Sequence, residues 1–473
     1  MEQTELIVIG AGPAGIQAAI IASELGLEVT LIDSQPSAGG QYFKQIPQEF
    51  NIHDTGYHQK QESKLFRQLE NSTLKFLGKT LVWGISHNPK TNLWQLTLQG
   101  DNWPSRIETP FIVIATGAYD RSIPFPGWDM PGVITAGAAQ IMIKNQGILP
   151  GKQVIVTGTG PLQLAVASNL FEAGAKVQAV LECNQNLFFR GIPHLPSIWG
   201  QWRRLEEGFQ YAGNIIKTKT PYRIGWSVIK ADGFEKVEEV TIGKLDTEGY
   251  PIHTTNQNLA FDAVVVGFVL TPSTEFFRLL DVDVYYSQPE GVFLPKRNDF
   301  FQTSAQGIYP VGDCAGIGGA NLALLEGQIA AFDISVKSGL ANSSRMDKAI
   351  QQTKARILRE QKFARMLGDV FSIPQGLFTL AQPDTIIYLY EHIKLAEVQE
   401  AVNFGAQSVT DIKNITRRGM ENCQGRTCDS ILAQILSREA KCDPQECHYL
   451  NIRPPVHPIS ISIIEEKDYE VLA

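Results

Sequence analysis

The stretch Leu6-Ile7-Val8-Ile9-Gly10-Ala11-Gly12-Pro13-Ala14-Gly15 decides the fold of this chain. Its opening apolar run predicts a buried strand, and the Ala- and Ile-rich segment that continues to Leu25 predicts a helix. Gly10 permits the tight turn between them, Gly12 lets a pyrophosphate approach the backbone, and Gly15 lets the helix pack closely on the strand. The stretch therefore predicts a nucleotide-binding turn between a strand and a helix.

The residues after this turn complete a dinucleotide-binding βαβ unit. Val29–Ile32 predicts the second strand, and Asp33 follows it where a carboxylate can accept hydrogen bonds from ribose hydroxyls. The helix that begins at Pro13 and Ala14 presents its unpaired N–H groups and positive dipole end to the phosphates. Because both strands, the helix and the acid are present, the unit predicts a bound dinucleotide.

A second passage repeats the pattern about one domain further along the chain. Val154–Thr157 predicts a strand, and the next strand ends at Glu182. The third glycine position holds Gln163, whose long side chain we expect to obstruct close packing of helix on strand. An acid at Glu182 repels a 2′-phosphate, which favours NAD(H) or an adenine nucleotide such as ATP over NADP(H). Two interpretations stay open: a working second nucleotide site, and a retained fold whose site is empty or repurposed. The turn residues assigned to this candidate site are Gly158, Gly160 and Pro161.

Other parts of the chain also indicate an α/β fold. Three short apolar runs end in small residues, which is typical of a parallel sheet covered on both faces. They are Phe111–Ala115, Ala263–Val266 and Ile308–Val311. Between Phe76 and Ile107 apolar residues alternate with Thr and Gln, which predicts an antiparallel β-meander. Charged residues with a helical period over Arg345–Leu367 predict a long helix.

Length, charge and cysteine content exclude several classes of protein. The 473 residues suggest about three domains, and the formal net charge of −8 gives no basis for nucleic-acid binding. No apolar stretch approaches the ~20 residues that span a bilayer. The acidic first residues and the short first apolar run are unlike an export signal, so we expect a cytoplasmic protein. Most of the six cysteines lie close together near the C-terminus, which is unlike a disulfide framework.

The two glycine motifs, flanked by Ala115-Thr116-Gly117 and Gly312-Asp313, resemble those of two-dinucleotide-binding flavoproteins. The resemblance implies that the first motif holds FAD and that the second nucleotide-binding domain is inserted into the first. It also implies that Asp313 lies near the ribityl chain and that the helix opening at Ala320 faces the flavin. The FAD-binding residues that it implies are Gly10, Gly12, Pro13, Ala14, Gly15, Asp33, Gly40, Gln41, Val82, Ala115, Thr116, Gly117, Gly312, Asp313 and Ala320.

Longer passages narrow the resemblance to one group of flavoprotein subunits. They are Ala115–Gln140, Gly39-Gly40-Gln41 and Gly312–Ala320, within a similarity that runs from about Glu5 to Pro458. The group contains the A-type flavoprotein of opine oxidases, the B-type flavoprotein of hydrogen cyanide synthase and the α-type flavoprotein of dye-linked L-proline dehydrogenases.

The predicted architecture has three domains. An FAD-binding Rossmann-like domain comprises residues 1–123 and 272–340. An NAD(P)-binding-like domain over residues 124–271 is inserted into it. Residues 341–473 form a small helical C-terminal module.

The C-terminal module resembles bacterioferritin-associated ferredoxin, whose family binds a 2Fe-2S cluster through a Cys-x-Cys-Glu segment and a later Cys-x₄-Cys segment. The later segment is present as Cys423 to Cys428, but Tyr388 and Tyr390 stand where the first two cysteines belong. A phenol with a pKa near 10 is a poor substitute for a thiolate ligand. We therefore expect no cluster and no metal. Cys423 and Cys428 would be remnants of the site, with both tyrosine rings packed into the vacated space.

The other candidate reactive residues carry weaker signals. Cys442 and Cys447 repeat the same spacing, so a rewired four-cysteine site stays open as an alternative. Cys183 and Cys314 stand singly, and we expect both to be small buried residues. His194 lies in a candidate active-site loop, but we assign no catalytic residue.

The resemblance implies an FAD-containing oxidoreductase, the flavoprotein subunit of a hetero-oligomeric amino-acid or amine dehydrogenase of the opine, glycine or proline type. In related complexes a separate glycine-oxidase-like flavoprotein subunit oxidises the small-molecule amine, so this chain would relay electrons. Two alternatives stay open. One is a stand-alone NADH-dependent flavin reductase, which requires a working second site, and the other is a catalytically weak structural subunit.

Overall fold

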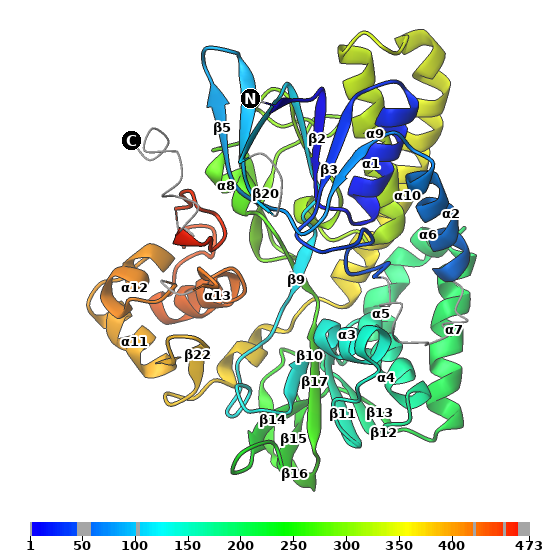
Figure 1. The fold of residues 1–473 in the computed structure, drawn as a ribbon. Helices are drawn as coiled ribbons and strands as arrows, with labels where there is room; N and C mark the ends of the chain where they lie inside the picture. Colours follow the sequence, from blue (N-terminus) through cyan, green and yellow to red (C-terminus); the bar gives the residue numbers. More distant parts are fainter. Residues whose placement is uncertain (1, 45–57, 101–104, 420–421, 448–450, 462–473) are drawn as a thin grey trace.

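The computed structural model describes residues 2–44, 58–100, 105–419, 422–447 and 451–461. Within them the chain forms two α/β folds, one above the other in Figure 1, and a group of C-terminal helices beside them. Each α/β fold contains a five-stranded parallel sheet. This architecture confirms the predicted fold class.

The first fold is built on a parallel sheet in the order β21-β8-β2-β3-β4. Its strands are β2 (Leu6–Ile9), β3 (Val29–Ile32), β4 (Lys75–Leu77), β8 (Phe111–Ile114) and β21 (Ile308–Pro310). Successive residues point to opposite faces, so Leu6 packs on one side of the sheet and Ile7 on the other. Because both faces are covered, strand β2 is apolar at every position.

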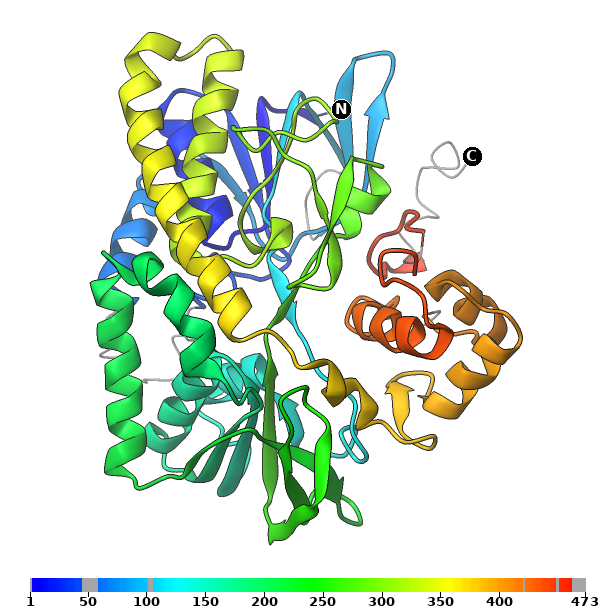
Figure 2. The same cartoon turned by 180° about the vertical axis from the view of Figure 1, so that it is seen from behind.

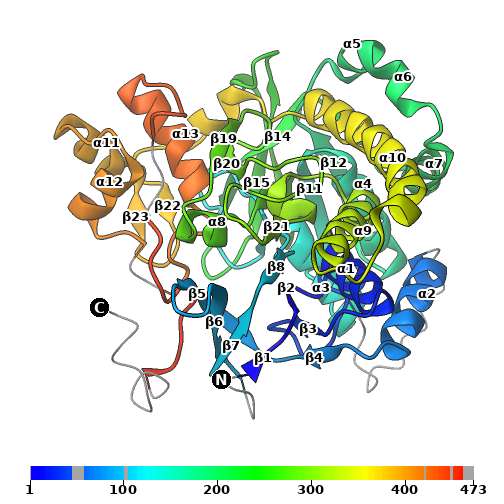
Figure 3. The ribbon, with the colours of Figure 1, turned by 90° about the horizontal axis from the view of Figure 1, so that it is seen from above.

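Helices cover one face of this sheet and a smaller sheet covers the other, as Figure 3 shows from above. The helices are α1 (Pro13–Glu24), α9 (Ala320–Lys337), α10 (Ser343–Val370) and α2 (His58–Glu70). The smaller sheet contains β1 (Glu2–Gln3), β7 (Arg106–Thr109), β6 (Leu93–Gln99) and β5 (Leu81–Asn88). Strands β5, β6 and β7 pair antiparallel, which confirms the predicted β-meander.

The second fold repeats this layering around a parallel sheet in the order β10-β17-β11-β12-β13. Its strands are β10 (Val133–Thr135), β11 (Gln153–Thr159), β12 (Lys176–Glu182), β13 (Tyr222–Ile224) and β17 (Ala263–Phe268). The helices on one face are α3 (Ala136–Gln146), α4 (Pro161–Glu172) and α7 (Trp202–Lys217). The other face carries an antiparallel sheet of β14 (Trp226–Asp232), β15 (Glu239–Leu245) and β16 (Pro251–Ala260).

Two features connect the folds. Strand β9 (Ala118–Asp120) pairs antiparallel with β18 (Leu270–Pro272), so the chain enters and leaves the second fold side by side. The long helix α10 packs against α9 of the first fold and against α5 (Leu187–Gly191) and α6 (Leu195–Ile198) of the second. Figure 2 shows this helix from behind, running from one fold to the other. The domain limits stay predictions.

The C-terminal helices lie beside the two folds and contact the first through the tail of the chain. They are α11 (Leu395–Asn403), α12 (Val409–Thr416) and α13 (Asp429–Ala440), preceded by η3 (Gln375–Thr379) and the hairpin β22 (Ile386–Tyr388) and β23 (Ile393–Lys394). The first fold also contains α8 (Glu275–Leu279), β19 (Val284–Ser287), β20 (Val292–Pro295) and η2 (Gly312–Ala315). The N–H of Val456 donates to the carbonyl of Trp83 at 2.7 Å.

In the described part of the chain, no helix combines the length and apolarity needed to cross a bilayer.

Candidate dinucleotide sites

The first glycine turn lies at the carboxyl edge of the first sheet, between β2 and α1. A Cβ on Gly10 would lie 2.4 Å from the carbonyl oxygen of Ala115, and one on Gly15 would lie 1.9 Å from the carbonyl oxygen of Gly10. Because both obstacles are backbone atoms, only glycine fits at these two positions. A Cβ on Gly12 would meet no atom within 4 Å. The surface above Gly12 is therefore open, as a pyrophosphate requires.

Asp33 follows β3 at the same edge, and the backbone holds its carboxylate in place. Oδ2 accepts the N–H of Ala11 at 2.6 Å, and Oδ1 accepts the N–H of Gln35 at 2.7 Å. Burial raises the pKa of the half-buried Asp33 carboxyl above its ordinary value, against the lowering effect of the two backbone hydrogen bonds. The carboxylate is thus fixed beside the turn and keeps lone pairs for ribose hydroxyls.

Two further loops meet the first turn. A Cβ on Gly40, whose φ is +61°, would lie 2.8 Å from the Cα of Gly12. A Cβ on Gly312 would lie 3.0 Å from the Cβ of Ala14. The structure therefore brings the loops after β3 and β21 to the glycine turn, as the resemblance implies.

The remaining residues assigned to FAD lie around this edge with fewer constraints. Pro13 is the first residue of α1, and Thr116 follows β8. Gly117 has a φ of +74° and faces open space. Gln41 is exposed, whereas Val82 is buried in β5 with a side chain only 3% exposed. Their contacts with FAD stay predictions.

Asp313 organises the start of α9. Its Oδ1 accepts the N–H of Gly318 at 2.9 Å and that of Gly319 at 3.0 Å. Burial raises the pKa of the Asp313 carboxyl. These hydrogen bonds hold the helix start at Ala320 against the carboxyl edge of the sheet. A helix N-terminus at that place can stabilise negative charge on a reduced flavin.

Glu326 is a residue of this site that sequence reasoning missed. It lies on α9 and is 2% exposed, and its Oε2 accepts the N–H of Gly312 at 2.9 Å. The same oxygen forms an ion pair with Arg297 at 2.9 Å. A buried carboxylate needs such partners, and here they fix the loop that carries Asp313. An acid among the apolar residues of α9, which contains one further acid at Asp333, is the signal that could have found it.

The first site therefore fits FAD. Gly12 and the start of α1 would hold the pyrophosphate, Asp33 the ribose, and the loop from Gly312 to Ala320 the flavin end. When bound, FAD supplies two-electron redox chemistry.

The second glycine turn lies at the same place in its βαβ unit as the first, but its N-cap glycine has positive φ whereas φ is −79° at Gly12. It lies between β11 and α4, where a Cβ on Gly158 would lie 2.0 Å from the carbonyl oxygen of Gly267. Gly160 has a φ of +102°, and Pro161 is the first residue of α4. The backbone is thus that of a nucleotide-binding turn, but its surroundings differ.

Glu182, at the end of β12, is completely buried, unlike Asp33. Its side chain is 0% exposed, and this burial raises the pKa of its carboxyl. Oε2 accepts the N–H of Gly160 at 3.1 Å and the amide Nε2 of Gln163 at 3.3 Å. Oε1 accepts the N–H of Asn184 at 2.9 Å. All of these donors belong to the chain itself, and a contact of Glu182 with ribose stays a prediction.

The expectation that Gln163 obstructs packing of α4 on the sheet is wrong. Its side chain is 1% exposed and lies beneath the helix. It lies next to Gly267 on β17 without crowding, since a Cβ at Gly267 would lie 3.7 Å from the Cγ of Gln163, an ordinary van der Waals contact. The hydrogen bond to Glu182 then satisfies the buried amide nitrogen.

The segment Phe371–Ser372, which follows α10, lies on the second turn. Thr159 Oγ1 donates to the Phe371 carbonyl at 3.3 Å, and a Cβ on Gly160 would lie 3.9 Å from the Cβ of Phe371. Asn184 Nδ2 donates to the Ser372 carbonyl at 3.0 Å, and Arg190 Nη2 donates to Ser372 Oγ at 2.6 Å. The chain itself therefore occupies space over the second turn that is open over the first.

Each single cysteine lies beside one of the turns: the N–H of Cys183 donates to the carbonyl of Gly158 at 2.9 Å, and Cys314 lies in the loop after Gly312. Cys183 and Cys314 are buried, which confirms the prediction. Burial raises the pKa of Cys314 to about 12 and that of Cys183 further, so both are poor nucleophiles at neutral pH. His194 Nε2 lies 3.4 Å from Asp369 Oδ2 on α10.

A buried polar network lies where the first cluster cysteines would stand. Tyr388 is 1% exposed and donates its hydroxyl to Asp429 Oδ1 at 2.5 Å. Arg418, which is 0% exposed, donates to the Tyr388 oxygen at 2.6 Å and lies 3.2 Å from Asp429. The packing expected of the tyrosine rings is correct for Tyr388 and wrong for Tyr390, whose side chain is 61% exposed. Strand β22 ends at Tyr388, so Tyr390 falls in the turn that follows.

The four C-terminal cysteines are all free. Burial raises the pKa of Cys428 to about 12, and the nearby Cys423 is half-buried. The sulfurs of Cys442 and Cys447 lie 3.1 Å apart. Among the residues that the structure describes, no group of three or more His, Cys, Asp or Glu side chains could hold a metal ion. The absence of a cluster stays a prediction.

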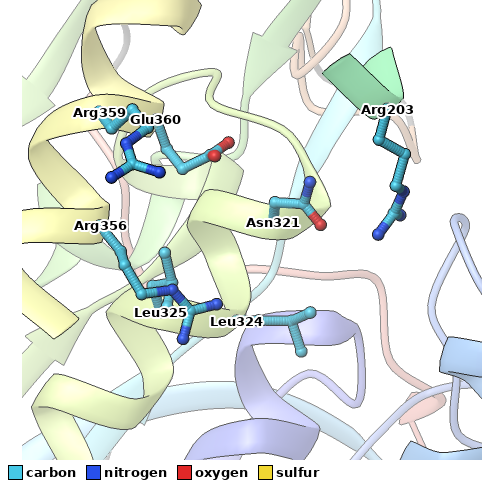
Figure 4. Close-up of a pocket in the computed structure, with 7 residues that line it drawn as sticks. All are labelled: Arg203, Asn321, Leu324, Leu325, Arg356, Arg359 and Glu360. Atoms are coloured by element: carbon cyan, nitrogen blue, oxygen red, sulfur yellow. The ribbon is translucent and has the colours of Figure 1, made fainter. Parts of the chain in front are cut away.

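A cavity of about 200 Å³ lies between α7, α9 and α10, close to the start of α9 (Figure 4). Its lining residues are Arg203, Asn321, Leu324, Leu325, Arg356, Arg359 and Glu360. The carboxylate of Glu360 is paired with Arg204 at 2.7 Å. Three guanidinium groups thus give this cavity a positive wall. Because the residues come from three separate helices, no local sequence motif marks it.

The fold and the first turn define an FAD-dependent oxidoreductase of the two-dinucleotide-binding class. Residues 4–339 match the family model described as pyridine nucleotide-disulphide oxidoreductase, and the chain belongs to this family. Residues 383–466 match the model described as sarcosine oxidase A3 domain.

Similar proteins include components of oxidases. The A-type component of opine oxidase from Agrobacterium tumefaciens is 29% identical over 470 residues, which cover 97% of this chain and 90% of that protein. The hydrogen cyanide synthase component HcnB of Pseudomonas protegens is 27% identical over 485 residues, which cover 98% of each chain. The solved structure of L-proline dehydrogenase from P. horikoshii shares the fold, with a TM-score of 0.68 at 19% identity, over 98% of this chain and 80% of that chain. The resemblance to this group is confirmed, and the likeness to bacterioferritin-associated ferredoxin stays a prediction.

Proposed function

We propose that this chain is the FAD-carrying subunit of a heteromeric amino-acid or amine dehydrogenase of the opine, glycine or proline type. A glycine-oxidase-like partner subunit oxidises the amine, and this chain relays the electrons. The names of the relatives support this proposal, since the A-type component of opine oxidase and the HcnB component of hydrogen cyanide synthase match nearly the whole chain.

The observation that carries the proposal is the difference between the two glycine turns. Gly12 faces open space, whereas Gly160 faces Phe371 and the acid beside it, Glu182, is buried among donors of the chain itself. A chain with one open dinucleotide site can hold FAD but lacks a place for NADH. The flavin must then receive its electrons from a partner subunit rather than from NADH bound in the second fold. This argues against a stand-alone NADH-dependent flavin reductase. For the same reason we propose that neither NAD nor ATP binds in the second fold.

Anaerobic reduction with and without a partner subunit tests the proposal. The FAD-loaded chain is mixed with opine, glycine or proline, first by itself and then together with a glycine-oxidase-like subunit from the same source. We expect electron transfer to an external dye through this chain only when both subunits are present. Gly12→Val provides the control, because the flavin of the partner should still accept two electrons from one equivalent of amine but should no longer pass them to the dye.

Two outcomes contradict the proposal. Reduction of the isolated chain by an amine would place a substrate site in this chain. Full dye reduction with the Gly12→Val complex would make the chain a structural subunit.

A further inference from the structure

Helix α7 has two apolar faces, and only one of them is covered. On the inner face Ile215 is buried against α4. On the outer face stand Trp202, Phe209 and Ile216, which are 65%, 75% and 75% exposed. Their spacing of seven residues places them on one side of the helix. A soluble helix that is apolar on two faces normally has a partner on both.

The outer face continues onto the neighbouring short helices. The large apolar side chains exposed there are Phe188, Phe189, Leu195 and Trp199, with exposed fractions of 61–76%. Figures 1 and 3 show α5, α6 and α7 together along one outer edge of the molecule. Monomeric proteins rarely expose so large an apolar patch, and Trp and Phe are enriched in the centres of interfaces.

We infer that this edge is an interface with a second copy of this chain, in which the two α7 helices pair antiparallel. Self-complementary shape supports a second copy. A Cβ on Gly213 would meet no atom within 4 Å, so the outer face has a notch one helical turn from the exposed ring of Phe209. A two-fold axis that crosses the outer face at the level of residue 211, midway between Phe209 and Gly213, puts Phe209 of each copy over the Gly213 notch of the other.

Charge supports the same arrangement. With the axis at the level of residue 211, Glu206 of one copy faces Ile216 and Lys217 of the other. Both side chains are exposed, and no ion pair involves either of them among the residues that the structure describes. The antiparallel pair therefore brings opposite charges together at both ends of the contact.

The exposed apolar surface of this edge is large enough for a stable dimer. A large aromatic side chain buries about 150–250 Å². The exposed aromatic and aliphatic side chains of this edge therefore supply on the order of the ~800 Å² that each partner contributes to a standard interface. This inference concerns the outer edge of the second fold and does not depend on the proposed electron relay.

Analytical ultracentrifugation of the full FAD-loaded chain tests the interface. We expect a dimer for the natural sequence and a dissociation constant at least about 100-fold higher for Phe209→Glu, because a carboxylate would be buried in the notch. Phe404→Glu is the matched control, since Phe404 is also 75% exposed but follows α11, far along the chain. It should leave the dissociation constant unchanged.

A charge swap tests the orientation of the helices. Glu206→Lys and Lys217→Glu should each weaken the dimer about 5-fold, and the double variant should return it to within about 2-fold of the natural value. A monomeric natural chain at micromolar concentrations would overturn the inference. So would a Phe209→Glu variant that dimerises normally, or a double variant weaker than both single ones. Unchanged flavin absorbance and circular dichroism of each variant show that it is folded.

Discussion

The two glycine turns of this molecule lie at the same place in their βαβ units but have opposite surroundings, and φ is −79° at Gly12 and +102° at Gly160. In the first, Gly12 faces open space at the carboxyl edge of the sheet. In the second, Gly160 faces Phe371, which arrives from the end of α10. A glycine motif therefore marks the position of the turn, while we expect a distant segment of the chain to decide whether that turn is accessible to a ligand.

The acids beside the two turns differ in the same way. Asp33 is half-buried and accepts two backbone N–H groups, so it retains capacity for a ligand. Glu182 is fully buried and accepts the backbone N–H groups of Gly160 and Asn184 and the Gln163 amide. We therefore expect the first acid to bind a ligand and the second to hold the fold together.

The largest effect is expected from Gly12→Val. The valine side chain would extend into the open space that a pyrophosphate needs, so FAD affinity should fall at least about 100-fold, near 3 kcal/mol. The backbone of Gly12 is extended and its Cβ meets no protein atom, so the fold should survive. Flavin absorbance of the purified variant measures the loss. Gly191→Val, at another open glycine, is the control and should keep its FAD. A yellow Gly12→Val protein would contradict the assignment.

Alanine substitutions of the two acids should separate binding from stability. Glu182→Ala leaves buried donors unpaired and should cost about 3 kcal/mol of unfolding free energy without changing FAD affinity. Asp33→Ala should weaken FAD about 10-fold through the lost ribose contact and cost less stability. Denaturant unfolding and FAD titration of both variants provide the comparison. Equal effects of the two variants on FAD affinity would remove the distinction between the sites.

The burial of Glu182 also predicts a pH dependence. Its pKa is raised above the ordinary 4.5 in the folded state, so the folded chain binds more protons than the unfolded chain above that pH. The stability that Glu182 contributes is therefore present below pH 4.5 and declines as the pH rises through the raised pKa. Relative to Glu182→Gln, the natural chain should lose about 1.4 kcal/mol for each unit by which the pKa is raised. Urea unfolding of both proteins at a series of pH values measures this, and a pH-independent difference would contradict it.

The smallest effect on stability is expected from the hydrogen bonds that hold the segment Phe371–Ser372. Arg190→Ala removes the hydrogen bonds to Ser372 at 2.6 Å and to Asn184 at 2.7 Å. We expect a loss of about 1 kcal/mol, and faster hydrogen exchange in the segment after α10. Arg365→Ala, at an exposed position of α10, should change neither. Unchanged exchange in Arg190→Ala would show that Arg190 does not hold the segment.

Much of the fold and of the first site could be predicted from the sequence, because their determinants are local. Gly10, Gly15 and Asp33 act within one βαβ unit, so their spacing carries the information. The position of Phe371 on the second turn could not be predicted, because some two hundred residues separate it from Gly160. Non-local packing also brought Tyr388 to Arg418 in the C-terminal part and Gln163 to Gly267.

Anaerobic titration of the FAD-loaded chain with NADH decides whether the first turn is the single open dinucleotide site among the described residues. We expect the visible absorbance of the flavin to stay unchanged and calorimetry to detect no binding of NADH. Bleaching of the flavin by one equivalent of NADH would show instead that the second turn is accessible, and the contrast between the two turns would then be wrong.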